Sequence, residues 1–131
     1  MSSELQQAVK MTRYPVDAFA FVQRGLDFTV RREHGEADST AELLDDEQPS
    51  RHVSGRLLCE GLRDYAIQQY GLLAGTVLRR WRIHRCEDFG HIVFAMVESG
   101  MMHKTDEDSI DDFIDVFSFR EAFGSNRVAL S

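Results

Sequence analysis

The chain has 131 residues, a hydrophobic content of 43%, a charged content of 28% and a formal net charge of −7. This length predicts one domain, residues 1–131, with a core of its own, and no apolar run approaches the roughly 18 residues that a membrane-spanning helix needs. Residues 1–10 lack the apolar stretch of a secretory signal, and Cys59 and Cys86 match neither metal-site nor redox-motif spacing. We therefore expect a cytoplasmic protein without a metal or other cofactor and without membrane binding.

The charge is distributed unevenly along the chain. Residues 1–85 contain 12 Lys or Arg and 12 Asp or Glu, whereas residues 86–131 contain 3 and 10. Within the first part, residues 33–50 hold seven acids and no Lys or Arg, and residues 51–85 hold seven arginines. Such asymmetry predicts an oriented surface field. The alternative is a set of solvated helix faces whose charges neutralise one another in the fold.

The first third of the chain predicts two helices and a loop. Leu5–Thr12 forms a short helix of weak amphipathicity, and Pro15 is well placed as the first residue of the next helix. Over Val16–Arg32 apolar residues return at helical spacing, with a strand as the alternative for the second half. Residues 33–50 then form an acidic loop, in which Thr40–Asp46 makes one or two helical turns at most.

Two further helices are expected before residue 82. Ser54 is a good N-cap for a helix that reaches Tyr70 and ends at Gly71. Its inward face would consist of Leu58, Leu62, Tyr65 and Ala66. Apolar residues over Leu73–Trp81, beginning with Leu73 itself, mark a short helix that is followed by a turn over Arg82–Arg85.

The strongest helical pattern covers Glu87–Ser99. Apolar residues recur there at i, i+3, i+4, i+7 and i+8: Phe89, Ile92, Val93, Met96 and Val97. Gly90 and Phe94 widen this stripe to more than half of the circumference, which is typical of a central core helix. Cys86 is expected at the N-cap and Gly100 at the C-terminal end.

Beyond Gly100 the pattern favours a β-hairpin. Met101–Thr105 and the alternating stretch Phe113–Phe119 would be its strands. The alternative is a helix that begins at Ser109, because Ser109 and Asp112 have capping-box spacing. Residues 119–123 predict a final helical turn, and residues 124–131 a tail. The predicted fold is thus mainly α, with four to five helices and a short C-terminal hairpin, winged-helix-like; the alternative is an all-α bundle.

Several short strings of this chain occur together in one known group of sequences. They are Tyr14-Pro15, Phe21-Val22, Phe28-Thr29, His52-Val53-Ser54-Gly55, Leu62-Arg63-Asp64-Tyr65-Ala66, Glu87-Asp88-Phe89-Gly90-His91-Ile92-Val93-Phe94, Val97-Glu98-Ser99-Gly100, Lys104-Thr105 and Asp112-Phe113. In these strings the chain resembles an uncharacterised family of small bacterial proteins, found chiefly in planctomycetes and verrucomicrobia. In the family pattern a Thr usually stands at position 86 and a Gly at position 82. The resemblance implies no activity.

The candidate interaction site is the basic turn between the short helix predicted over Leu73–Trp81 and the helix predicted over Glu87–Ser99. Its residues are Arg79, Arg80, Trp81, Arg82 and Arg85, and Arg with Trp is typical of binding hot spots. The order of helix, turn, helix and hairpin also resembles a winged helix-turn-helix. However, the would-be recognition helix, Glu87–Ser99, contains no Lys or Arg and carries acidic residues that would face the phosphates. A nucleic-acid-associated regulator is therefore the alternative function.

Other chemistry finds less support in the residues. The acidic stretch from Asp106 begins like a calcium loop, but Ile110 occupies a ligand position and no Gly stands sixth. Cys86 beside Arg85 at a helix N-terminus favours a lowered thiol pKa, the alternative being an ordinary small residue at a helix start. No nucleophile elbow, Walker loop or dinucleotide fingerprint occurs. We expect a non-enzymatic protein-interaction module that binds another protein or itself. The acidic C-terminal region would dock on the basic turn, inside one molecule or between two copies.

Overall fold

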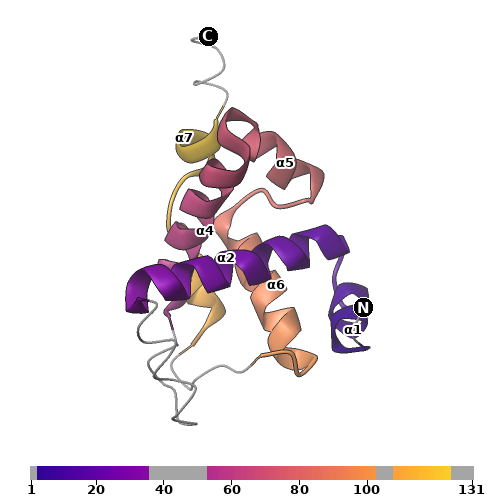
Figure 1. Cartoon of the computed structure of the whole chain (residues 1–131). Coiled ribbons are helices and arrows are strands. Elements are labelled where there is room, and N and C mark those ends of the chain that lie inside the picture. Colours follow the sequence, from indigo (N-terminus) through magenta and orange to yellow (C-terminus); the bar gives the residue numbers. More distant parts are fainter. Residues whose placement is uncertain (1–2, 36–52, 103–107, 125–131) are drawn as a thin grey trace.

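The computed structural model describes residues 3–35, 53–102 and 108–124. The elements follow one another as α1 (Ser3–Lys10), α2 (Val16–His34), α4 (Gly55–Tyr70), the 3-10 turn η2 (Gly71–Leu73), α5 (Ala74–Arg80), α6 (Cys86–Glu98), the 3-10 turn η3 (Ile110–Phe113) and α7 (Phe119–Phe123). These ranges contain no strand, so the mainly α fold is confirmed (Figure 1).

The first long helix lies across the two others that build the core. α2 packs on both α4 and α6 (Figure 1). The strand alternative for its second half is wrong, because the helix continues without interruption to His34. In that half the Thr29 hydroxyl donates to the Gly25 carbonyl at 2.7 Å, which satisfies a buried hydroxyl inside the helix.

Two glycines allow α2 and α4 to approach closely. A Cβ atom at Gly61 would lie 1.9 Å from Thr29 Oγ1, and one at Gly25 would lie 2.2 Å from Leu62 Cδ2. Neither position leaves room for a side chain without displacement of its neighbour. Close packing of this kind is typical of helix pairs with small residues at the crossing, and it fixes where α2 crosses α4.

α4 begins and ends where the sequence predicts. The Ser54 hydroxyl accepts a hydrogen bond from the Leu57 amide at 3.1 Å, as expected of an N-cap. The short helix predicted over Leu73–Trp81 is found as α5 (Ala74–Arg80), and Leu73 itself lies before it and is 63% exposed. Residues 71–73 form a 3-10 turn before α5, and this turn removes Leu73 from the buried face of the helix.

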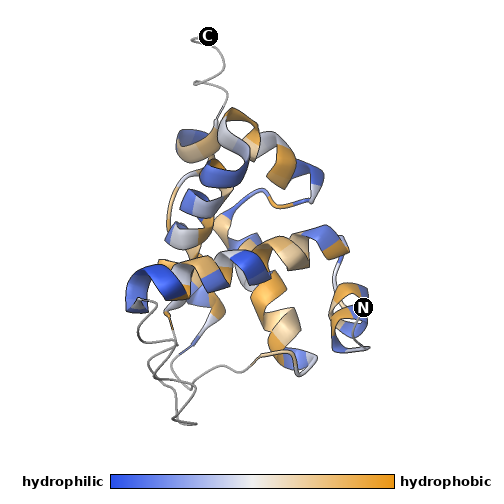
Figure 2. Cartoon of the chain, in the orientation of Figure 1, coloured by the Kyte–Doolittle hydropathy of each residue, from blue (hydrophilic) through white to orange (hydrophobic). Residues whose placement is uncertain are grey.

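α6 is the central helix that its pattern predicts. Its middle turns are almost uniformly apolar (Figure 2), and its buried side chains include Phe89, Ile92, Val93 and Met96. One detail differs from the expectation. The N-cap is Arg85, whereas Cys86 is the first helical residue and is buried.

The predicted C-terminal hairpin is not seen. Phe113–Phe119 contains no strand: it runs from the end of η3 through bends into α7, and Met101 and Met102 lie in a bend. The alternative start at Ser109 is found instead, as a 3-10 turn in which the Asp112 carboxylate accepts from the Ser109 amide at 3.2 Å. The final helical turn is confirmed as α7.

Phe113 explains why helical turns replace the hairpin. Its ring carbons would lie about 2.9 Å from a Cβ at Gly55 of α4 and from one at Gly90 of α6, so the ring occupies the space that both glycines leave. Only 3% of Phe113 is exposed. An extended strand at this position would move the ring out of the space between Gly55 of α4 and Gly90 of α6. The remaining predictions for the acidic loop (Thr40–Asp46), for residues 103–105 and for the tail after 124 fall outside the described residues.

Candidate functional site

Arg82 occupies a backbone position that glycine normally takes. α5 ends in a Schellman motif, in which the Ile83 amide donates to the Leu78 carbonyl and the Arg82 amide to the Arg79 carbonyl, both at 2.9 Å. This motif requires a left-handed residue directly after the cap, and Arg82 has a φ of 68°. The fully buried Ile83 and Leu78 supply the apolar contact that accompanies the motif.

α6 ends in the same motif but uses glycine. The Met101 amide donates to the Met96 carbonyl at 2.8 Å and the Gly100 amide to the Val97 carbonyl at 3.1 Å, with a φ of 90° at Gly100. A side chain with a Cβ costs about 1–2 kcal/mol in the left-handed region. Arg82 therefore tolerates a backbone strain that a glycine would relieve. Strain retained at an exposed arginine points to a use for its side chain.

Asp88 fixes the turn that carries Arg82. One carboxylate oxygen accepts from the Tyr14 hydroxyl at 2.5 Å. The other accepts from the His84 amide at 2.7 Å and the Arg85 amide at 3.2 Å. Burial and the hydrogen bond with Asp88 raise the pKa of Tyr14 above its usual range. Asp88 thereby ties the connection before α2 to the start of α6.

These elements enclose a hollow, which we call the basic hollow, with a volume of about 590 Å³. It is lined by Arg13, Tyr14, Arg82, His84, Arg85, Glu87, Asp88 and His91. Both of its carboxylates are already engaged, since Asp88 accepts the three hydrogen bonds above and Glu87 lies 3.7 Å from Arg85. Arg13 and Arg82 make no ion pair within the described ranges; Arg82 donates to the Arg13 carbonyl at 3.4 Å. Neither guanidinium group is neutralised by a carboxylate of the described residues, so both can bind an anion.

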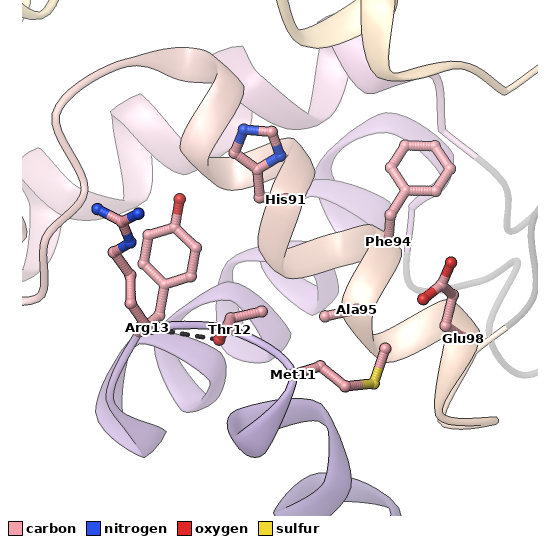
Figure 3. A pocket seen from close by; sticks show the side chains of 8 residues that line it. Met11, Thr12, Arg13, His91, Phe94, Ala95 and Glu98 are labelled. Carbon is pink, nitrogen blue, oxygen red and sulfur yellow. Dashed lines mark hydrogen bonds between the residues drawn. The ribbon is translucent and has the colours of Figure 1, made fainter.

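A second hollow of about 340 Å³ continues from the first along α6. The two share Arg13, Tyr14 and His91, and we call the second the apolar hollow because Met11, Phe94 and Ala95 line it. In Figure 3 the residues of the connection between α1 and α2 face those of α6 across this space. Met11 is 46% exposed although it is apolar. The two hollows adjoin, and we call the pair the groove; one end carries arginines, and the other is lined by apolar side chains together with Thr12 and Glu98.

The predicted interaction residues divide into three groups. Arg82 and Arg85 line the basic hollow. Arg79 and Arg80 lie exposed on the last turn of α5 and line neither hollow. Trp81 is half-buried, with its ring centroid 5.5 Å from that of Phe21 and 6.1 Å from that of Tyr70, so it packs on the core.

The sequence did not reveal several groove residues. Arg13, His91 and Met11 lie far along the chain from the basic turn or on the helix that was expected to be core. Two local features of the sequence could have pointed to these residues. Tyr14 directly precedes Pro15, the expected first residue of a helix, and Asp88 and His91 are polar residues on an otherwise apolar helix. The packing of α1 on α6 and the hydrogen bonds from Tyr14 to Asp88 and from Arg82 to the Arg13 carbonyl bring these segments together.

Docking of the acidic C-terminal region on the basic turn within one molecule finds no support in residues 109–124. No ion pair joins these residues to Arg79–Arg85, whereas Arg85 pairs with Glu87, with 3.7 Å between nitrogen and oxygen. In the described part of the chain no three His, Cys, Asp or Glu side chains are grouped to hold a metal ion. Over the same part, none of the helices has the length and apolarity to cross a membrane.

Comparisons with protein-family models, with curated proteins and with solved structures find no match for this chain. The family resemblance in its sequence strings therefore stays an expectation.

Proposed function

We propose that the protein is a non-enzymatic protein-interaction module whose groove binds an acidic segment of a partner protein. The observation that carries the proposal is Arg82, which keeps a left-handed backbone at the mouth of the basic hollow where α6 uses Gly100 for the same motif. Its guanidinium, which pairs with no carboxylate of the described residues, and that of Arg13 provide planar donors that match carboxylate geometry. A cytoplasmic location, expected from the sequence, belongs to the same proposal.

The lining of the apolar hollow indicates which side chains the partner segment contributes. Met11 and Phe94 line the hollow that Arg13 also lines, and the Phe94 ring packs on its other side against Phe113, with ring centroids 6.1 Å apart. A segment with carboxylates followed by one large apolar side chain would place its charges on Arg13 and Arg82 and its apolar group on Met11. Burial of that group adds affinity that salt does not screen. We therefore expect an acidic segment with an apolar anchor.

Protein is a better partner than nucleic acid for this groove. Strong binding to a duplex needs a series of phosphate contacts, whereas the groove offers only Arg13 and Arg82 as arginines that form no ion pair among the described residues. Trp81 is engaged with Phe21 and Tyr70, so its ring is not free to stack on a base. The winged-helix-like arrangement lacks the predicted strand at 113–119. The regulator function remains the alternative.

Fluorescence anisotropy tests the proposal with a labelled peptide of several Glu and one Phe. The double variant Arg13→Glu/Arg82→Glu should weaken binding by about tenfold or more, because it removes two charge-assisted contacts. Arg79→Glu/Arg80→Glu is the matched control, since it changes the net charge equally outside the groove. An equal loss in both variants would show that the general field, and not the groove, binds the peptide.

Two further measurements identify the source of the acidic segment. Sedimentation of the wild-type protein and of Arg13→Glu/Arg82→Glu tests a second copy as partner: salt-sensitive association that the variant loses supports self-docking. Binding to a labelled DNA duplex and to a single-stranded RNA tests the alternative. Tight nucleic-acid binding that depends on Arg79 and Arg80, without peptide binding, would replace the proposal by the regulator function.

A further inference from the structure

One face of the molecule, outside the groove, combines exposed leucines with arginines. Leu72 and Leu73 lie in the 3-10 turn η2 and are 58% and 63% exposed. Arg79 and Arg80 follow them at a spacing of seven residues, which is two helical turns, so the four side chains lie on the same side of the chain. Arg79 donates to the Thr76 hydroxyl at 3.4 Å, and neither arginine pairs with a carboxylate of the described residues. We call Leu72, Leu73, Arg79 and Arg80 the leucine–arginine face.

The sequence around the leucine–arginine face contains no acid. Residues 65–86 carry four arginines and neither Asp nor Glu, although the net charge of the whole chain is −7. Exposed apolar side chains bordered by charges of one sign are typical of a surface that binds a partner. The partner that fits this face is acidic and has an apolar centre.

The chain itself carries a surface of this kind. Ile114 is 42% exposed, and the exposed residues Asp111 and Asp115 lie on either side of it in the sequence. Neither carboxylate forms an ion pair with a cation of the described residues. We call Asp111, Ile114 and Asp115 the isoleucine–aspartate corner. In charge and in apolar content it is complementary to the leucine–arginine face.

The two surfaces lie at opposite ends of α4. The leucine–arginine face begins in η2, directly after Tyr70, the last residue of α4. The isoleucine–aspartate corner overlaps η3, whose Phe113 packs against Gly55, the first residue of α4. The 16 residues of α4 separate these ends by about 24 Å. The exposed leucines therefore cannot reach Ile114 of the same molecule, and contact between the two surfaces requires a second copy.

We propose that copies of this chain associate by docking the isoleucine–aspartate corner of one copy on the leucine–arginine face of the next. Ile114 packs on Leu72 and Leu73, and the two carboxylates pair with the two arginines. Each docked copy retains a second surface, so the contact closes into a symmetric assembly or continues along a chain of copies. Because both surfaces are small, the association is weak and depends on protein concentration. Neither surface belongs to the groove, so this inference does not rest on the proposed function.

Sedimentation velocity of the full chain tests the association. The sedimentation coefficient should rise between about 10 µM and 1 mM protein, as expected of a small interface. Leu72→Ser/Leu73→Ser and Ile114→Ser should each weaken the association by about tenfold or more, and circular dichroism establishes that each variant is folded. Asp111→Lys replaces Ile114→Ser if that variant does not fold. A wild-type chain that stays monomeric throughout would overturn the proposal.

Charge reversal tests the ionic part of the contact. Arg79→Glu/Arg80→Glu should weaken the association, and the wild-type association should weaken with salt because exposed charges are screened. Arg24→Glu/Arg31→Glu is the matched control, since it changes the net charge equally on α2, away from both surfaces. An equal change in both double variants would overturn the proposal.

A mixture of two variants tests whether the two surfaces bind each other. Leu72→Ser/Leu73→Ser keeps the isoleucine–aspartate corner, and Ile114→Ser keeps the leucine–arginine face. An equimolar mixture should therefore form 1:1 dimers at concentrations where each variant alone is monomeric. A mixture that stays monomeric would show that neither surface is the partner of the other and would overturn the proposal.

Two further measurements test other occupants of the leucine–arginine face. Arg13→Glu/Arg82→Glu should associate like the wild type, and association that this variant loses while Leu72→Ser/Leu73→Ser keeps it would overturn the proposal in favour of the groove. Flotation with vesicles of phosphatidylserine and phosphatidylcholine tests a lipid surface. Vesicle binding by a monomeric protein, abolished in Leu72→Ser/Leu73→Ser, would also overturn the proposal.

Discussion

At the scale of single residues, Arg82 couples backbone strain to the proposed binding. Its φ of 68° lies in the region that glycine adopts most easily. In Arg82→Gly the relief of strain is partly offset by the greater freedom of glycine in the unfolded chain. The free energy of unfolding should therefore stay the same or rise by up to about 1 kcal/mol.

Peptide affinity should move in the opposite direction. The Arg82→Gly variant removes one of the two unpaired guanidinium groups of the basic hollow, so it should bind the acidic peptide more weakly while it is at least as stable in urea. Gly100→Arg is the reciprocal control, because it introduces the same strain at the end of α6 and should destabilise the fold. A marked loss of stability in Arg82→Gly would mean that the arginine side chain supports the fold.

Tyr14 gives the fold a dependence on alkaline pH. Its pKa is raised in the folded state by burial and by the hydrogen bond to Asp88. The folded state therefore holds its proton at a pH where the unfolded chain releases it, so this contribution is complete below pH 10.0 and is lost as the pH rises above that value. Urea denaturation between neutral and alkaline pH should show a steeper loss of stability for the wild-type protein than for Tyr14→Phe. Identical pH profiles would contradict the structural role of this hydroxyl.

At the scale of elements, the crossing of α2 and α4 depends on Gly61. A Cβ there would meet Thr29, whose hydroxyl is fixed by the Gly25 carbonyl. We expect Gly61→Ala to reduce the free energy of unfolding by about 1–3 kcal/mol through overpacking. Gly25→Ala is the comparison, since it meets only the end of the Leu62 side chain and gains helix propensity. Equal effects of the two changes in thermal melts would show that the crossing adjusts freely.

The same elements show how far the sequence determines the fold. Helical periodicity and the residues at the helix ends were sufficient to predict α2, α4 and α6. Each of these helices buries a wide apolar stripe and has Pro, Ser or Gly next to at least one of its ends. The hairpin predicted for the C-terminal region was wrong because a tertiary contact outweighs the alternating pattern of Phe113–Phe119. Phe113 fits a slot made by Gly55 and Gly90, and no local pattern encodes that slot.

The candidate site was predictable only in part. Arg82 and Arg85 were identified from the density of arginine, but the same criterion included Arg79 and Arg80, which line neither hollow. Arg13 and Met11 enter the groove because Tyr14 binds Asp88 across the fold. A hydrogen bond between residues so far apart is not visible as a spacing in the chain.

At the scale of the whole molecule, the groove is a small surface with arginines on a chain whose net charge is negative. The net charge is −7, yet the connection before α2 and the turn before α6 together place unpaired arginines beside an apolar surface. Such an arrangement favours short-range recognition over long-range steering. Binding should therefore weaken with salt but persist through the apolar contact.

The most direct test of the groove is the mapping of amide shifts in the ¹⁵N-labelled protein during titration with the peptide of Glu and Phe. We predict saturable shifts that centre on Arg13, Tyr14, Arg82–Arg85 and His91 and that disappear in Arg13→Glu/Arg82→Glu. Shifts that centre instead on the separate hollow lined by Arg24, Phe28 and Tyr65, or the absence of saturable shifts, would contradict the account.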